Sequence, residues 1–313
     1  MGFKINSRGS GFVPDGDPTI SELADFIEIK AILSDESSYS ITAVKTQLGI
    51  ASDESIYADK NHVDAEEAKI DDSITEIDER RISSIRKYPF QTSQFAISVD
   101  NHCDEIIKDV YTFLLFVTRV NMNTMKTQNG IDATKTFEQL CSAIMENYWG
   151  NSAKAFVIGT GSETSDFETK INKAIKEIRE PGISFRWPEG SLRMEKDGGT
   201  DVMVYIPFAD NKKGRFIALG QCKTGTSWRN SVSQLNPKSF NEKYFSPPFT
   251  FTPVVLFLVS EAFYENWETY QRDSHGLLLD RCRLMQYLPE SLSDGLLNNI
   301  REWNRCIIEL LSS

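Results

Sequence analysis

Residues 198–202 read GGTDV and residues 216–223 read FIALGQCK, and a polar turn at 210–214 separates the two segments. The second segment begins apolar and ends polar, as a strand does when it emerges from a core. Because side chains alternate along a strand, Gln221 and Lys223 should face one side of the sheet and Cys222 the other. If the segments pair as a hairpin, counting outward from the turn puts Asp201 opposite Gln221 and Lys223. The sequence therefore predicts a carboxylate, an amide and an ammonium at one edge of a sheet.

This combination of side chains suits the hydrolysis of phosphodiester bonds. A hard divalent cation such as Mg²⁺ takes oxygen ligands, and the candidates are Asp201, the Gln221 amide oxygen and the Cys222 carbonyl. Such an ion polarises a phosphoryl oxygen and lowers the pKa of a bound water. Lys223 is placed to orient that water or to stabilise negative charge on the phosphate. We therefore expect a magnesium-dependent enzyme, with Mn²⁺ as a substitute.

The same residues resemble the motif of the PD-(D/E)XK nuclease superfamily, which includes many restriction and DNA-repair nucleases. Asp201 matches the metal-binding Asp, and Gln221-Cys222-Lys223 matches the (D/E)-x-K element. Glu138, in the stretch FEQL at 137–140, matches the acidic residue often found on the preceding core helix. The likeness covers roughly residues 130–262. Gln221 stands where Asp or Glu is usual, as in the Q-x-K variant of Mrr-like restriction nucleases.

This resemblance implies a fold, a substrate and a setting. The implied fold class is α/β, a restriction-endonuclease-like mixed sheet flanked by helices. The implied catalytic set is Glu138, Asp201, Gln221 and Lys223, acting with Mg²⁺ on double-stranded DNA. The implied setting is the effector of a restriction or antiviral defence system.

The remaining pattern divides the chain into an acidic, mainly helical module at 1–128 and a nuclease-like α/β domain at 129–313. Residues 1–18 are a loose lead-in and residues 51–68 the best linker. Apolar spacing predicts helices over 19–33, 40–48, 71–88, 104–122, 132–149, 166–180, 228–244 (broken at Pro237) and 293–311. Predicted strands cover 155–158, 183–187, 202–208, 216–223, 253–260 and 276–287.

All the excess negative charge lies in the first quarter of the chain. The net charge is −11, and residues 1–80 carry 18 acidic and 7 basic residues, whereas residues 81–313 carry 27 of each. So acidic a segment repels a phosphate backbone, which argues against reading its first two helices as a helix-turn-helix. It either docks a basic partner or forms a solvated helical face. Because a free nuclease would harm its own cell, we expect control through homo-oligomerisation or through a regulatory protein that binds this module.

Several side chains around the hairpin are candidates for contacting a phosphate backbone or an unstacked base. They are Arg186, Arg193, Trp228, Gln234 and Lys238. The alternative for Trp228 is a place partly buried under a solvated helix.

Other features of the sequence exclude certain kinds of site and do not assign a function. The five cysteines form no C-x-x-C pair and the three histidines are scattered, so neither a disulfide framework nor a zinc site is predicted. No signal peptide or membrane-spanning run is present, and we expect a cytoplasmic protein without a membrane partner. Two rivals to the nuclease stay open: a catalytically inactive nuclease-fold subunit that binds DNA or protein, and a transcriptional regulator that uses the N-terminal helices.

Overall fold

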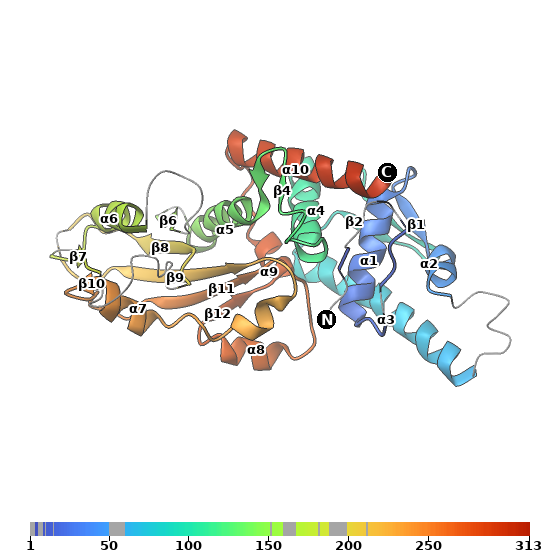
Figure 1. Cartoon of the computed structure of the whole chain (residues 1–313), viewed down its shortest axis with the longest axis horizontal. Coiled ribbons are helices and arrows are strands. Elements are labelled where there is room, and N and C mark those ends of the chain that lie inside the picture. Colours follow the sequence, from blue (N-terminus) through green and yellow to red (C-terminus); the bar gives the residue numbers. More distant parts are fainter. Residues whose placement is uncertain are drawn as a thin grey trace.

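A computed structural model shows a mixed α/β protein built around a five-stranded sheet (Figure 1). The strands are β6 (Lys154–Val157), β8 (Val202–Ile206), β9 (Phe216–Lys223), β11 (Val254–Val259) and β12 (Leu277–Leu279), in the order β12-β11-β9-β8-β6. β6, β8 and β9 pair antiparallel, and β9, β11 and β12 pair parallel. The structure describes residues 4–5, 9, 11–14, 16–49, 60–150, 152–158, 167–180, 182–187, 199–210 and 212–313.

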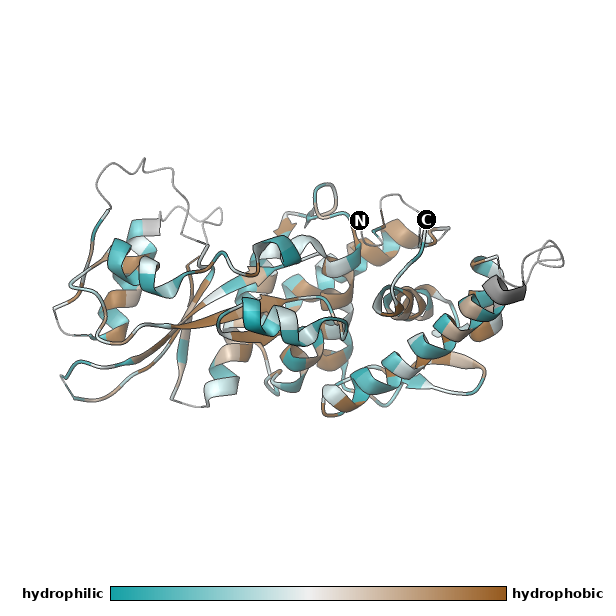
Figure 2. Ribbon diagram, turned by 90° about the horizontal axis from the view of Figure 1, so that it is seen from below, coloured by the Kyte–Doolittle hydropathy of each residue, from teal (hydrophilic) through white to brown (hydrophobic). Residues whose placement is uncertain are grey.

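Helices cover both faces of this sheet, and its inner strands consist largely of apolar residues, which are brown in Figure 2. Helix α5 (Ala133–Trp149) covers one face, where Ala218 and the side chains beside it join the main core. Helices α6 (Phe167–Ile178) and α7 (Pro237–Tyr244) cover the other face, where Ile217 and Leu219 point. The alternation predicted for residues 216–223 is therefore confirmed.

Short elements complete this part of the chain. Strands β7 (Ser184–Phe185) and β10 (Phe245–Ser246) form a separate antiparallel pair at the far end of the sheet (Figure 1). The predicted helix over 228–244 is a 3-10 helix, η2 (Ser227–Ser231), followed by α7. The predicted strand over 276–287 is wrong beyond Leu279: Asp280 caps a new helix, α9 (Arg281–Gln286), by accepting a hydrogen bond from Arg283 N.

The N-terminal region is helical, as predicted, and also contains a small sheet. Its helices are α1 (Ile20–Leu33), α2 (Ile41–Gln47), α3 (Lys60–Ser83) and α4 (Glu105–Arg119). Thr19 and Glu22 form a capping box that starts α1. The sheet, in the order β1-β3-β2, was not predicted, because β1 (Ser38–Ser40), β2 (Phe90–Thr92) and β3 (Ala96–Val99) are short strands. Ile5, in the expected loose lead-in, is buried and donates its N–H to Arg119 O.

The C-terminal helix joins the two halves of the molecule. The remaining elements are the hairpin of β4 (Thr127–Gln128) and β5 (Ile131–Asp132), α8 (Trp267–Asp273) and α10 (Asp294–Ser312). Figure 1 shows α10 running along the molecule over α5 and α4. The buried stripe of α10, which includes Ile300 and Trp303, enters one apolar core that also contains Ile5 and Ala218. The boundary at 128/129 therefore does not separate two cores.

A buried ion-pair network ties α1 to α3, α4 and α9. Arg80, Arg119 and Arg281 are fully buried and converge on Asp25 of α1. The shortest N–O distances to the Asp25 carboxylate are 2.7 Å from Arg80, 2.5 Å from Arg119 and 2.8 Å from Arg281. Burial by itself would raise the pKa of Asp25, but the three guanidiniums together hold that pKa well below its usual range.

A second acid in the network, Glu28, is held differently. The hydroxyls of Tyr88 and Tyr111 donate to its carboxylate over 2.5 and 3.0 Å, and Arg80 contacts it at 2.9 Å. Burial outweighs these partners and raises the pKa of Glu28.

This network corrects the interpretation of part of the acidic module, although Asp71, Asp72 and Glu79 on α3 are exposed, as expected of a solvated helical face. Glu22, Asp25 and Glu28 on α1 and Glu76 on α3 are buried. These four carboxylates therefore neither form a solvated face nor dock a basic partner, because arginines from within the chain already hold them.

Within the residues that the structure describes, the helices all fall short of the length and apolarity needed to cross a membrane.

Candidate functional site

Asp201 lies at the mouth of the β8–β9 hairpin, against the polar end of β9. The two strands pair from Ile206 and Phe216 at the turn to Val202 and Gly220. Asp201 extends the ladder by one step, donating its N–H to Gly220 O over 2.8 Å. Its Oδ2 accepts the N–H of Cys222 over 2.7 Å. The structure thus places Asp201 beside residues 221–223, as the count along the hairpin predicted.

Gln221 follows in the strand and is almost completely buried, with 2% of its surface exposed. Gly199 makes room for it: a Cβ at Gly199 would lie 3.1 Å from Gln221 Nε2. Gly199 also has a φ of +78°, in the region that favours glycine. Among the described residues, the Gln221 Oε1 atom is buried without a hydrogen-bond partner. A buried acceptor of this kind is costly unless something fills it, which makes Oε1 a candidate ligand atom.

Cys222 points to the opposite face, where it meets Cys141 of α5. Burial, followed by the hydrogen bond with Cys141 and the charges of Asp201 and Glu138, raises the pKa of the Cys222 thiol well above its ordinary value. The thiol therefore stays protonated and is neither a nucleophile nor a thiolate ligand. Glu138 therefore acts on the face of the strand that carries Cys222, and not on the face to which Gln221 points.

Lys223 ends the strand and is half-buried. Its carbonyl accepts the N–H of Ser260, which follows β11, over 3.2 Å. Within the described part of the chain, its ammonium makes no ion pair. The next loop is fixed to the helical region, because Gly225 N donates to Val117 O of α4 over 3.0 Å. The edge of the sheet that carries Lys223 is therefore held by α4.

Trp228 has a structural position rather than the expected nucleic-acid contact. It is 1% exposed and packs against Phe257, Phe263 and Tyr270. Its Nε1 donates to Glu261 Oε2 over 2.7 Å. No face of the ring remains for a base, so this expectation is wrong. The apolar surroundings supplied by β11, α8 and the loop between them explain why the ring turns inward.

The other expected nucleic-acid contacts do not gather around Asp201. Arg186 follows β7 at the far end of the sheet (Figure 1) and donates from Nη2 to Glu242 O over 2.6 Å. Gln234 is exposed in the turn before α7, and Lys238 is exposed on α7. Arg193 lies outside the described residues. Their spacing in the sequence gave no information on which end of the sheet each would occupy.

The donor set suits a cation only in part. Among the described residues, no group of three or more His, Cys, Asp or Glu side chains is arranged to hold a metal ion. The groups at this strand end that could contribute are the Asp201 carboxylate and the Gln221 amide oxygen, whereas Glu138 belongs to α5, which covers the face of the sheet to which Cys222 points. The unfilled Oε1 of Gln221 is the observation that favours an oxygen-preferring ion such as Mg²⁺ here.

Two features near the site were missed from the sequence. Thr200 is fully buried beside Asp201, and within the described residues its Oγ1 has no hydrogen-bond partner. Glu261, directly after β11, binds Arg119 of α4 at 3.4 Å and Arg229 at 2.6 Å, which links the ion-pair network to the end of the sheet. No sequence signal identifies Glu261, because its side-chain partners come from two distant segments, α4 and residues 228–229.

Comparison of the chain with protein-family models, with curated proteins and with solved structures gives no match.

Proposed function

We propose that this chain is a metal-dependent endonuclease that hydrolyses phosphodiester bonds in double-stranded DNA. One observation carries the proposal: the contact between Asp201 Oδ2 and Cys222 N over 2.7 Å. It brings the carboxylate to the strand end that also bears Gln221 and Lys223. An acid, a buried amide oxygen and an ammonium then lie at the same end of the paired strands β8 and β9.

The residues would divide the work as follows. Mg²⁺, when bound, would supply Lewis-acid activation of the phosphate and of a water ligand. Asp201 and Gln221 would hold the ion, and Gly199 would keep the Gln221 amide in place. Lys223 would stabilise charge on the phosphate, because its ammonium has no carboxylate partner among the described residues.

The order of elements also supports the proposal. Helix α5, the antiparallel strands β6, β8 and β9, helix α7 and the parallel strand β11 occur in this order along the chain, with α6 and β7 between β6 and β8. This order is similar to the core of the PD-(D/E)XK nucleases, with Asp201 and Gln221-Cys222-Lys223 at the positions of the family motif. By this analogy alone the enzyme would be an effector in a restriction or antiviral system.

The direct test is cleavage of supercoiled plasmid by the full chain with Mg²⁺, Mn²⁺ or EDTA. We expect metal-dependent nicking or linearisation, and a loss of about 100-fold or more in rate for Asp201→Asn and for Lys223→Ala. The matched controls are Asp273→Asn on α8, which is partly exposed, and Lys213→Ala in the hairpin turn, which is exposed. Equal cleavage by Asp201→Asn and Asp273→Asn would refute the assignment.

A second candidate function is a catalytically inactive nuclease-fold subunit. Gln221 favours it, because an amide in place of a carboxylate lowers the charge that holds a cation. Calorimetric titration with Mn²⁺ separates the two functions. If Gln221 is a ligand, Gln221→Glu should bind the ion at least as tightly as the natural chain, and Gln221→Leu should abolish binding. No cleavage with any metal, together with unchanged binding in Gln221→Leu, would favour the inactive subunit.

A further inference from the structure

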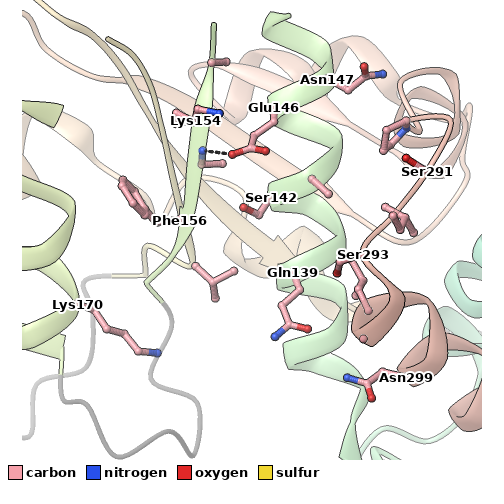
Figure 3. Close-up of a pocket in the computed structure, with 18 of the residues that line it drawn as sticks. Gln139, Ser142, Glu146, Asn147, Lys154, Phe156, Lys170, Ser291, Ser293 and Asn299 are labelled. Atoms are coloured by element: carbon pink, nitrogen blue, oxygen red, sulfur yellow. Dashed lines mark hydrogen bonds between the residues drawn. The ribbon is translucent and has the colours of Figure 1, made fainter. Parts of the chain in front are cut away.

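A large cavity opens beside the edge strand of the sheet, next to the candidate site. It has a volume of about 1060 Å³ and lies between α5, β6, α6 and the first turn of α10. Figure 3 shows Gln139, Ser142 and Glu146 along its α5 wall, and Lys154 and Phe156 on β6. We call this cavity the β6 groove.

The β6 groove carries net positive charge on a protein whose net charge is −11. Three lysines line it: Lys154 on β6, and Lys170 and Lys173 on α6. Its carboxylate, Glu146, is directed to the backbone, where Oε1 accepts the N–H of Ala155 over 2.8 Å (Figure 3). The first turn of α10 opens onto the same space at Ser293 and Gly295, and Asp294 in that turn offsets the positive potential of the helix N-terminus, so the lysines supply the positive charge. The groove is therefore suited to a polyanion.

One end of the groove reaches the candidate site. Val157 lines the groove and pairs with Val202, and Ile158 N donates to Asp201 O over 2.7 Å. On the α5 wall, Gln139 of the groove is the neighbour in sequence of Glu138. A chain of phosphates lying in the groove would thus end at Asp201.

A protein partner fits this groove less well. β6 is the edge strand, and an extended peptide adds to such an edge through free backbone groups. Here Glu146 already occupies the outward N–H of Ala155 in the middle of the four-residue strand. Strand addition is therefore blocked where it would have to start.

We propose that the β6 groove binds the sugar-phosphate backbone of the DNA that flanks the scissile phosphate, with Lys154 and Lys173 each contacting a phosphate. The choice of DNA as the ligand rests on the proposed function. The inference adds a DNA-binding groove that is separate from the strand ends carrying Asp201, Gln221 and Lys223. Lys154 and Lys173 are exposed, so their substitution leaves the core intact.

The test is the salt dependence of DNA binding by the full chain, measured by fluorescence anisotropy in EDTA, where metal-dependent cleavage cannot interfere. The probes are a labelled 20-base-pair duplex and one of its strands. Each lost phosphate contact reduces the slope of log K against log salt by about 0.9 for duplex and about 0.7 for single-stranded DNA. Lys154→Gln/Lys173→Gln should therefore reduce the slope by about 1.8 on the duplex, or by about 1.4 if the single strand is the form that binds.

The control is Lys176→Gln/Lys212→Gln, which removes the same charge from exposed positions outside the groove. Equal slopes for both double variants would overturn the proposal. So would a loss of binding to a labelled oligoglutamate peptide without any loss of binding to DNA, which would assign the groove to a protein partner.

The groove and the nuclease can fail separately. If the natural chain cleaves plasmid, and the Lys154→Gln/Lys173→Gln variant binds and cleaves DNA equally well, DNA binding in the β6 groove is refuted and the nuclease activity is supported. If DNA binding depends on Lys154 and Lys173 but no metal supports cleavage, DNA binding in the β6 groove is supported and the nuclease activity is refuted.

Discussion

Substituting Arg281 by Met should strongly destabilise the fold, although Arg281 lies outside the candidate site. Its guanidinium contacts the Asp25 carboxylate twice, at 2.8 and 3.1 Å, and donates to Ser260 O at 3.0 Å. Methionine fills a similar length of cavity but leaves Asp25 with one partner fewer in a place without water. Removing one partner of a buried ion pair costs about 3–5 kcal/mol, and we expect the free energy of unfolding to fall by that amount.

Urea unfolding followed by circular dichroism measures this loss. The control is Arg305→Met on α10, whose guanidinium is exposed and pairs with Glu302 and Glu309. Because water screens those pairs, the unfolding midpoint of the control should not move detectably. In the double variant Arg281→Met/Asp25→Asn the loss should be smaller than the sum of the single losses, because the two groups share one interaction. A loss below about 1 kcal/mol for Arg281→Met would refute the description of the network as buried and tightly paired.

Two further predictions concern Asp280 and Gly199. Burial raises the pKa of Asp280 to about 6 from 3.8, so the folded chain keeps a proton that the unfolded chain releases; stability should fall by roughly 2 kcal/mol as pH rises from 4 to 6. Asp280→Asn should flatten this part of the stability profile while preserving the cap of α9, and an unaltered profile in urea titrations at pH 4, 5, 6 and 7 would contradict the shift. Gly199→Ala should lower both stability, by about 1–2 kcal/mol, and Mn²⁺ affinity, because the new methyl group displaces the Gln221 amide. Gly182→Ala has nearly the same φ, +77°, with nothing within 4 Å, so it controls for backbone strain; equal Mn²⁺ affinity in the two variants would separate Gly199 from the site.

The local sequence pattern was sufficient to predict the central strands of the sheet and their register. Residues 216–223 form one strand as predicted, since their apolar start and polar end match a strand that leaves a core. The turn fixes the register, and the register alone brings Asp201 to Cys222. This geometry depends on contacts between neighbouring segments, so it can be counted along the chain.

Burial that depends on residues far away in the sequence could not be predicted from local patterns. Asp25 and Arg281 are 256 residues apart, and no local spacing in the sequence relates one to the other. Trp228 turned inward because β11 and α8 supply its aromatic neighbours. The strand predicted over 276–287 ends early because a cap at Asp280 overrides the apolar run. For Asp25 and Trp228 a tertiary partner outweighed the local pattern, and for residues 280–286 a local cap did.

The placement of α10 has a practical consequence for dissecting this protein. A truncation after residue 128 would bare the apolar side of α4, because Trp303 and Ile307 would no longer cover it. The complementary fragment would carry Arg281 without Asp25 and Glu28, the acids that neutralise it. Neither half should remain soluble alone, so point substitutions in the intact polypeptide are the appropriate way to separate the roles of the two halves.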